Sequence, residues 1–302
     1  MTEPLAHRCG FIAIVGRPNV GKSTLMNRIL GQKISITSRK PQTTRHQILG
    51  IKTDENVQAI YVDTPGLHLH AKKAINRYMN RAASTVLNDV DVVVFVVDAA
   101  RWTEEDDNVL VQLQREKTPV ILVINKIDKL NNKDLLLPLI DTWGRRMVFA
   151  AVIPISAKSG DNLDKLEQTV STYLPESGPL FPEEQVTDRS ERFLAAELIR
   201  EKLMRRLSKE LPYAVTVQIE KFSMENEVLH IDATIWVARK SQKGIVIGKS
   251  GEVLKEVGQK ARIDMEKQFE CKVFLNLWVK VMEDWSDKEQ QLRQLGYDDS
   301  GS

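Results

Sequence analysis

The fold of this chain is decided by Phe11-Ile12-Ala13-Ile14-Val15-Gly16-Arg17-Pro18-Asn19-Val20-Gly21-Lys22-Ser23-Thr24. An apolar, β-branched run leads into Gly-x4-Gly-Lys-Ser, the order expected for a strand, a phosphate-binding loop and a helix. The glycines let backbone N–H groups turn towards phosphate oxygens at the start of the helix. We expect Lys22 to bind the β- and γ-phosphates and the Ser23 hydroxyl to bind Mg²⁺. The predicted nucleotide contacts of this loop are Gly16, Asn19, Val20, Gly21, Lys22, Ser23 and Thr24.

Short β-branched runs alternate with amphipathic stretches over the first ~175 residues, which is typical of an α/β fold with a mixed, mostly parallel sheet and helices on both faces. The turn-like composition of residues 53–56 predicts a hairpin. Helices with one buried face are expected around Val109–Leu113 and Leu163–Tyr173. The expected strands are Phe11–Val15, His46–Lys52, Val57–Val62, Val92–Val97, Val120–Ile124 and Val152–Ile155.

A second motif, Asn125-Lys126-Ile127-Asp128, follows one of the predicted strands. The Asp128 carboxylate can accept hydrogen bonds from N1–H and the N2 amino group of guanine, whereas adenine would leave it unpaired. The motif therefore predicts a guanine-nucleotide site. The other predicted base contacts are Asn125 at the N7/O6 edge, Lys126 on the base plane, and Ser156, Ala157 and Lys158 near O6.

Between these two motifs lies Tyr61-Val62-Asp63-Thr64-Pro65-Gly66. Asp63 ends a strand, and we expect it to hold Mg²⁺ through water. The Gly66 N–H is expected to contact the γ-phosphate, which would make the following segment sensitive to hydrolysis. A plain turn explains the same residues, but their order along the chain with the other motifs favours the functional interpretation.

Together the motifs resemble the Era GTPases of the TrmE–Era–EngA group. The resemblance includes Gln42–Arg45, Gly31–Ser38, Leu211–Val217 and Leu292–Tyr297, and it covers nearly the whole chain. It implies hydrolysis of GTP to GDP and phosphate, with Mg²⁺ held by Ser23, Asp63 and a switch threonine. Thr43 and Thr44 both fit the last position, and Thr44 is favoured.

The resemblance also implies how hydrolysis is assisted. Asn19 corresponds to an asparagine that holds K⁺ beside the phosphates in potassium-dependent relatives, although it also suits a tight turn. Leu67 stands where Ras-like enzymes carry a water-orienting glutamine, so a Ras-type mechanism is excluded and no general base is predicted. The residues assigned catalytic roles are Asn19, Lys22, Thr44 and Gly66.

The composition changes at Leu174–Pro182, which contains three prolines and one glycine. Because proline interrupts both helices and strands, we expect a GTPase domain over residues 1–175, a linker over 176–187 and a second domain over 188–302. In the second domain the pattern predicts a helix opening at Asp188, with Glu191 in a capping arrangement. The further expected elements are strands Ala214–Phe222 and Val228–Ala238, a glycine-rich loop, a helix at about Glu252–Phe269 and a strand Val273–Val281.

The glycine-rich loop is Gly244-Ile245-Val246-Ile247-Gly248-Lys249-Ser250-Gly251. Its spacing is too short for a second phosphate-binding loop, but it matches the Gly-x-x-Gly loop of KH domains, which clamps about four single-stranded nucleotides. The element order predicts an α+β, type II KH domain. We expect Trp236 and Trp278 to lie in its core, Lys249 to contact phosphate and the preceding apolar residues to lie under the bases. The predicted RNA-binding residues are Ile245, Val246, Ile247, Gly248, Lys249, Ser250 and Gly251.

The formal net charge of +2 excludes binding of nucleic acid by bulk charge alone, but the charge is segregated. Arg28–Arg45 has five basic and no acidic residues, and Arg239–Arg262 has seven basic and two acidic residues. The tail from Glu283 has six acidic and two basic residues. RNA binding is therefore expected to be local.

Resemblance to the Era family implies an assembly factor that binds GTP or GDP, the 3′ end of 16S rRNA and the 30S subunit. We expect a cytoplasmic protein, because Cys9 and Cys271 lie at opposite ends of the chain and fit two free thiols. We expect a monomer, because nothing in the sequence suggests an obligate interface. One alternative is a peripheral GTPase of the inner membrane or cell cycle, whose second domain binds protein and whose Arg28–Arg45 segment touches anionic lipid. No acylation motif supports it. A partner in tRNA modification is a weaker alternative, because the extra enzymatic domain is missing. The longest apolar run, Val92–Val97, is too short to cross a bilayer.

Overall fold

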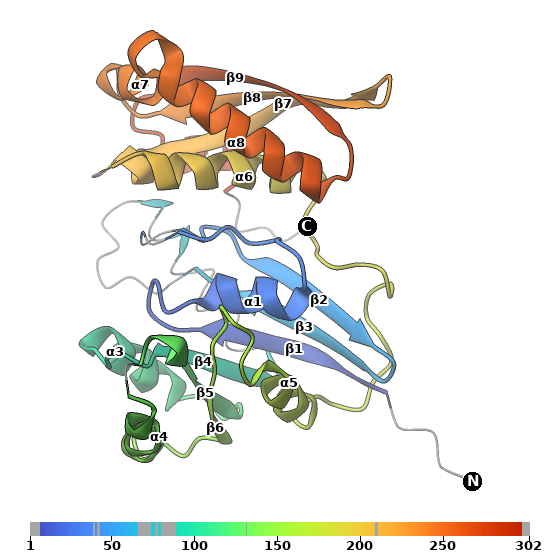
Figure 1. The fold of residues 1–302 in the computed structure, drawn as a ribbon, viewed down its shortest axis with the longest axis vertical. Coiled ribbons are helices and arrows are strands. Elements are labelled where there is room, and N and C mark those ends of the chain that lie inside the picture. The colour runs from blue at the N-terminus through green and yellow to red at the C-terminus, as the bar shows by residue number, and fades with distance from the viewer. Residues whose placement is uncertain are drawn as a thin grey trace. The chain divides into compact units, whose positions relative to one another are not determined.

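The computed structural model describes residues 7–38, 40, 43–65, 74–75, 78–79, 89–130, 132–208 and 211–297 (Figure 1). It forms two compact units. The first unit comprises Met1–Ser35, Thr44–Leu69 and Met79–Asp188, and the second comprises Ile36–Thr43, His70–Tyr78 and Arg189–Ser302. The domain bounds drawn from the composition stay a prediction.

The first unit contains a six-stranded sheet in the order β2-β3-β1-β4-β5-β6. β1 pairs in parallel with both β3 and β4, whereas β2 and β3 form the antiparallel hairpin expected from the sequence. The mostly parallel sheet is thereby confirmed. The strands are β1 (Arg8–Val15), β2 (Ile48–Asp54), β3 (Val57–Asp63), β4 (Val92–Asp98), β5 (Val120–Asn125) and β6 (Ala151–Pro154).

Helices cover both faces of this sheet, which is why β4 reads as an uninterrupted apolar run. α3 (Glu104–Leu113) and α4 (Leu136–Gly144) pack on one face through a core that includes Phe95 and Trp143. α1 (Lys22–Leu30) and α5 (Leu163–Ser171) lie on the other face (Figure 1).

The proline-rich segment after α5 runs along the first unit. The Gln58 side chain on β3 accepts hydrogen bonds from Leu180 N at 2.8 Å and Phe181 N at 2.9 Å, and Ile51 N donates to Val186 O at 2.8 Å. This segment is therefore fixed to the sheet by the Gln58 side chain of β3 and by the backbone of the edge strand β2, even though proline prevents it from forming a regular element.

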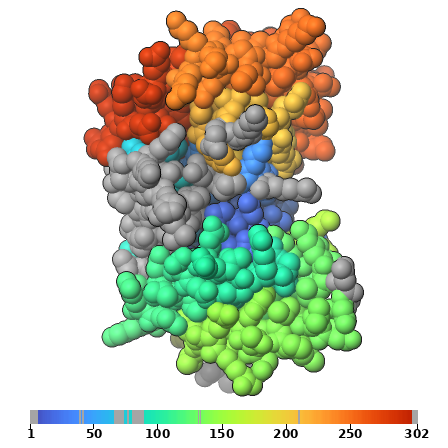
Figure 2. Space-filling view, turned by 90° about the vertical axis from the view of Figure 1, so that its left-hand side faces the viewer, coloured from blue at the N-terminus to red at the C-terminus, as the bar shows by residue number. Residues whose placement is uncertain are grey.

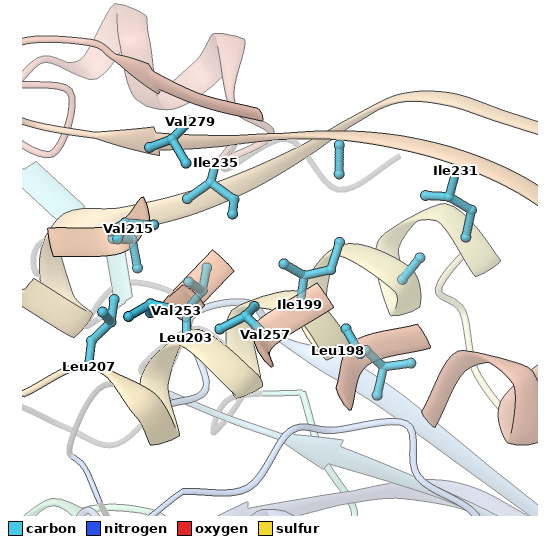
Figure 3. Packing of buried hydrophobic residues seen from close by; sticks show 14 of the residues in the cluster. Leu198, Ile199, Leu203, Leu207, Val215, Ile231, Ile235, Val253, Val257 and Val279 are labelled. Carbon is cyan, nitrogen blue, oxygen red and sulfur yellow. The ribbon is translucent and has the colours of Figure 1, made fainter. Parts of the chain in front are cut away.

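The second unit contains a three-stranded sheet in the order β7-β8-β9, in which β7 and β8 are antiparallel and β8 and β9 parallel. Figure 3 shows apolar side chains of α6 and α8 gathered beneath this sheet, among them Leu198, Leu203 and Val257. The elements are α6 (Glu191–Arg206), β7 (Val215–Glu225), β8 (Val228–Val237), α7 (Lys240–Ile247), α8 (Glu252–Gln268), β9 (Lys272–Val281) and α9 (Glu289–Gln294).

Two sequence expectations about helix positions were wrong. α6 begins at Glu191, and its N-cap is Ser190, whose hydroxyl accepts from Phe193 N at 3.3 Å; the Asp188 carboxylate accepts instead from Leu49 N at 3.0 Å. Residues 240–247, expected to be part of a loop, form α7. A glycine and β-branched residues lower the helix propensity of that segment, but burial of Val246 in the core overrides it.

The expectation that Trp278 lies in the core was also wrong, because its side chain is 46% exposed. Along β9, Val273 and Val279 are buried, whereas Phe274 and Trp278 are exposed on the opposite face of the strand. Among the described residues, α6 and α8 pack on the face of this sheet that carries Val273 and Val279, so an alternating strand directs its other side chains away from that core. No helix in the described residues has the length and apolarity needed to span a membrane.

Candidate functional site

The phosphate-binding loop joins β1 to α1 in a conformation that requires glycine. Gly16 has φ 149°, and a Cβ there would lie 2.3 Å from the Val96 carbonyl oxygen. Gly21, with φ 109°, precedes the first residue of α1. This geometry directs backbone N–H groups and the positive end of the helix into the loop, which suits an anion.

Lys22 is buried at the floor of this loop. Its Nζ donates to the carbonyl oxygens of Gly16 at 2.8 Å and Arg17 at 3.1 Å. Burial lowers the pKa of Lys22 to about 8, although the nearby Asp63 carboxylate acts in the opposite direction. A buried cation held by backbone carbonyls in front of a helix N-terminus is a preorganised partner for phosphate.

Oxygen donors gather at Asp63, where β3 ends. Its Oδ2 accepts from Ser23 Oγ and Ser35 Oγ at 2.8 Å each and from Thr44 Oγ1 at 3.3 Å. Its Oδ1 is buried without a hydrogen-bond partner among the described residues. Burial raises the pKa of Asp63, opposed first by the charge of Lys22. An unsatisfied carboxylate oxygen among hydroxyl groups is the hard donor set that Mg²⁺ prefers.

The structure separates the two candidate switch threonines. Thr44 Oγ1 lies 3.0 Å from Ser23 Oγ, whereas Thr43 Oγ1 bonds to Ser38 Oγ at 2.7 Å and donates to Lys40 O at 2.6 Å. Only Thr44 therefore faces the other predicted Mg²⁺ ligands.

Thr44→Ala is expected to lower the Mg²⁺ affinity of the nucleotide-bound protein by about 10- to 100-fold, because a hydroxyl beside the carboxylate is lost. Thr43→Ala should change it less than about twofold, and it serves as the matched control. Mg²⁺ titration of the rate of nucleotide release measures both effects. A larger loss of Mg²⁺ affinity in Thr43→Ala than in Thr44→Ala would mean that Thr43 is the Mg²⁺ ligand.

Two residues that the motifs did not indicate complete this region. Ser35, 1% exposed, donates to Asp63, and its backbone is held by the Asn27 side chain, which accepts from Ser35 N at 2.9 Å and donates to Ser35 O at 2.6 Å. The only sequence signal is that Asn27 follows Ser23 by four residues, on the same face of α1.

Asn125 joins three loops at the predicted base site. Its Nδ2 donates to Val20 O at 2.8 Å, and its Oδ1 accepts from Ala157 N at 3.0 Å and Lys126 N at 2.7 Å. The amide predicted to contact the N7/O6 edge is thus engaged with protein groups, and it fixes the Ala157 loop against the phosphate-binding loop.

Asp128 and Lys126 lie on the open side of Asn125. Asp128 is exposed, and one of its carboxylate oxygens accepts from the buried Ser156 Oγ at 2.7 Å, which orients the group. Lys126 Nζ bridges Asn19 O at 2.6 Å and Asp98 Oδ2 at 2.7 Å. Burial alone would raise the pKa of Asp98, but its bond to Lys126 holds that pKa below its usual value.

Several predicted residues lie at the rim or outside the described range. Asn19 is exposed and has φ 66°, Thr24 is half-buried and Lys158 is exposed. Gly66 and Leu67 lie outside the described residues, so their predicted roles stay predictions.

The predicted RNA-binding loop connects α7 to α8. Gly248 has φ 77°, and a Cβ there would lie 2.5 Å from Val253 Cγ2 and 2.9 Å from Val253 N. Lys249 and Ser250 are exposed beside it. Of the apolar residues expected under the bases, Ile245 is 58% exposed, but Val246 is fully buried and faces the core. Val246 therefore supports the loop from beneath and presents no surface to a ligand.

Comparison with protein families gives two matches. Residues 11–126 match the model described as a 50S ribosome-binding GTPase, and residues 210–286 match the KH domain. The first range includes the phosphate-binding loop and the second includes the Gly-x-x-Gly loop.

Full-length relatives are also similar. GTPase Era of Ectopseudomonas mendocina is 60% identical over 98% of this chain and 99% of its own, and GTPase Era of Azotobacter vinelandii is 60% identical over 99% and 100%. A crystal structure of Era in complex with MgGDPNP and nucleotides 1506–1542 of 16S ribosomal RNA has a TM-score of 0.93. It is 41% identical over 96% of this chain and 99% of its own.

Proposed function

Because the chain belongs to the Era family of GTPases, we propose that it is a ribosome assembly factor that hydrolyses GTP and binds the 3′ end of 16S rRNA. The observation that supports this proposal is that one chain brings together the predicted phosphate, Mg²⁺ and base groups that the structure describes and also carries a strained Gly-x-x-Gly loop. GTP and GDP are expected to set the state of the switch segments, and thereby the binding of RNA and the 30S subunit.

Different residues of the first unit have different roles in binding and hydrolysing GTP. Lys22 holds the β- and γ-phosphates, Asp128 binds the guanine edge, and Asn125 keeps the two regions in register. Mg²⁺, held by Ser23, Thr44 and Asp63, would neutralise charge on the phosphate oxygens when bound. Since phosphoryl transfer depends mainly on positioning and electrostatics, a dedicated base is not needed.

Crosslinking the purified chain to total bacterial RNA tests the RNA assignment. With a non-hydrolysable GTP analogue bound, crosslinks should concentrate near the 3′ end of 16S rRNA, and they should fall with GDP. Even coverage of all RNA in both nucleotide states would contradict the proposal. The same samples, incubated with 30S subunits before sedimentation, report on binding to the subunit.

We also assign Asn19 to a potassium site beside the phosphates. Its exposed amide on a left-handed turn is an oxygen donor at the rim of the loop. Hydrolysis in K⁺ is expected to be about tenfold faster than in Na⁺, because a cation there would stabilise developing negative charge. Asn19→Ala should abolish the difference between the two salts. Equal hydrolysis rates in K⁺ and Na⁺ would contradict the potassium site, and Asn19 would then only support the turn of the loop.

Contacts of the segment Arg28–Arg45 weaken the membrane alternative. Arg45 is fully buried, and Lys40 Nζ donates to carbonyl oxygens at the end of α6, whereas Arg28 is exposed. Basic groups already used inside the protein are not available to anionic lipid headgroups.

A further inference from the structure

A buried ion pair connects the phosphate-binding loop to α3. Arg17 Nε donates to Asp106 Oδ2 at 2.9 Å, and the two side chains are 8% and 0% exposed. Arg17 occupies a variable position of Gly-x4-Gly-Lys-Ser, and Asp106 belongs to no nucleotide motif. Removing charges from water is costly, so loss of either partner would leave the other as an uncompensated buried charge. Asp106 Oδ1 and Arg17 Nη2 are themselves buried without hydrogen-bond partners among the described residues.

Asp106 is held in place by the start of its own helix. The oxygen that receives Arg17 also accepts from Thr103 N and Thr103 Oγ1, both at 2.9 Å, in a capping arrangement at the N-terminus of α3. The carboxylate is thus fixed by three donors besides the helix backbone.

The start of α3 is in turn fixed to the core. Trp102 Nε1 donates to Asp107 Oδ1 at 2.7 Å, and its ring packs against Phe95 and Trp143 at centroid distances of 5.9 and 5.5 Å. The Arg146 guanidinium lies 4.5 Å above the same ring. Asp106 therefore projects from a rigid platform, as positioning groups require.

The backbone of Arg17 connects this ion pair to the phosphate site. Its carbonyl oxygen, with that of Gly16, accepts from Lys22 Nζ. Its Nη2 is buried without a hydrogen-bond partner in the described part of the chain. The bond from Nε to Asp106 therefore holds the guanidinium in place. Without that anchor, the buried cation would have to move towards water and take the start of the loop with it.

We propose that Asp106 is a positioning residue for phosphate binding: through Arg17 it fixes the first turn of the loop and the carbonyl oxygens that orient Lys22. This inference rests on the proposed GTP-binding function. The loop contacts phosphates in both the ground state and the transition state, so losing its position should raise KM for GTP more than it lowers kcat.

The test measures GDP dissociation constants and steady-state GTP hydrolysis for Asp106→Asn, Arg17→Met and the double variant. Each single change should weaken GDP binding by about 10- to 100-fold, and the double variant should be no weaker than the worse single one. KM should rise by a similar factor, with kcat within about threefold of the parent. Arg17→Lys keeps the positive charge. On a logarithmic scale, it should show about half of the loss of GDP affinity that Arg17→Met shows.

Glu105→Gln is the matched control, because it removes an exposed carboxylate from the same helical turn. Figure 2 shows that side chains of the α3 region reach the surface of the first unit. The control should bind GDP like the parent. Single variants that bind GDP within twofold of the parent, or losses that multiply in the double variant, would overturn the inference.

Folding of each variant is checked by its thermal transition. If Asp106→Asn does not fold, the Arg17→Met and Arg17→Lys pair decides: equal affinities in these two variants would overturn the inference, and a recovery in Arg17→Lys would support it. Failure of the unmodified chain to bind GDP would instead overturn the proposed function, which distinguishes the two.

Discussion

Asp128→Asn should lower the affinity for GTP by a factor on the order of 10⁴, with the fold intact. In the proposed site the carboxylate would accept from N1–H and the N2 amino group of guanine, whereas the asparagine amide would present an N–H group to one of these donors. The Ser156 hydroxyl, 2.7 Å from Asp128, holds the side chain in the orientation that creates this mismatch. Because Asp128 is exposed, its replacement leaves no buried charge unpaired.

Xanthine nucleotides provide the decisive comparison for this variant. Xanthine carries a carbonyl at C2, so the asparagine N–H would find an acceptor where guanine offers a donor. The affinity for xanthosine diphosphate should therefore rise as that for GDP falls, measured by competition with a fluorescent nucleotide. Asp134→Asn, a change at an exposed carboxylate nearby, should alter neither. An equal loss for both nucleotides would mean that Asp128 supports the fold and does not read the base.

The parts of the site that could be predicted are the contiguous motifs. Asp63 and Asn125 are the last residues of β3 and β5, and Lys22 and Ser23 begin α1 after the loop that leaves the carboxyl end of β1. Parallel pairing of β1 with β3 and β4, and of β4 with β5, brings these strand ends to one edge. A local pattern and one topological rule were therefore enough to bring the predicted phosphate and Mg²⁺ groups together.

The parts that could not be predicted depend on pairs of residues far apart in the chain. Asp106 meets Arg17 only because α3 packs beside the phosphate-binding loop, and acidic residues are common in the first turn of any helix. Ser35 likewise donates directly to Asp63, and the Asn27 side chain holds the Ser35 backbone in place. No periodicity in the sequence predicts either bond. Composition indicates such residues as charged or polar, but only the fold shows that they are buried.

The second unit shows where local propensity is overridden. Gly244 and the β-branched residues after it disfavour a helix, yet α7 forms because Val246 enters the core. Trp278 was expected inside because it lies in a strand of alternating apolar residues, but its side chain is on the face of β9 opposite to Val273 and Val279, which pack in the core. In both cases the environment of a residue depends on which helices pack on which face of the sheet. That packing is part of the tertiary structure, and the local sequence does not show it.

Gly248→Asp should weaken RNA binding by about 100-fold or more while leaving GTP hydrolysis unchanged. A residue other than glycine at φ 77° carries a strain of about 1–3 kcal/mol. Its Cβ would also meet Val253 Cγ2 at 2.5 Å and Val253 N at 2.9 Å, and the second of these is backbone that cannot turn aside. The loop must then shift away from α8, and the new carboxylate repels the phosphate groups that the loop would clamp. Strain and charge repulsion weaken the same contact with RNA. Their combined effect on the RNA affinity is therefore expected to be larger than the roughly tenfold loss that about 1.4 kcal/mol would cause.

Three variants of the same unit separate these causes. Lys249→Glu changes the charge without strain at Gly248 and should lose about tenfold in affinity and part of the salt dependence. Gly251→Ala introduces strain at φ 81° where nothing lies within 4 Å of the added Cβ. Gly244→Ala adds a methyl group in open space inside α7, so it should bind like the parent and stabilise the helix by up to about 1 kcal/mol. Filter binding to an RNA of nucleotides 1506–1542 of 16S rRNA, over a range of salt concentrations, measures all four variants. If Gly248→Asp and Lys249→Glu both bind this RNA like Gly244→Ala, the loop is not the RNA clamp, and the contact must lie on another surface of the second unit.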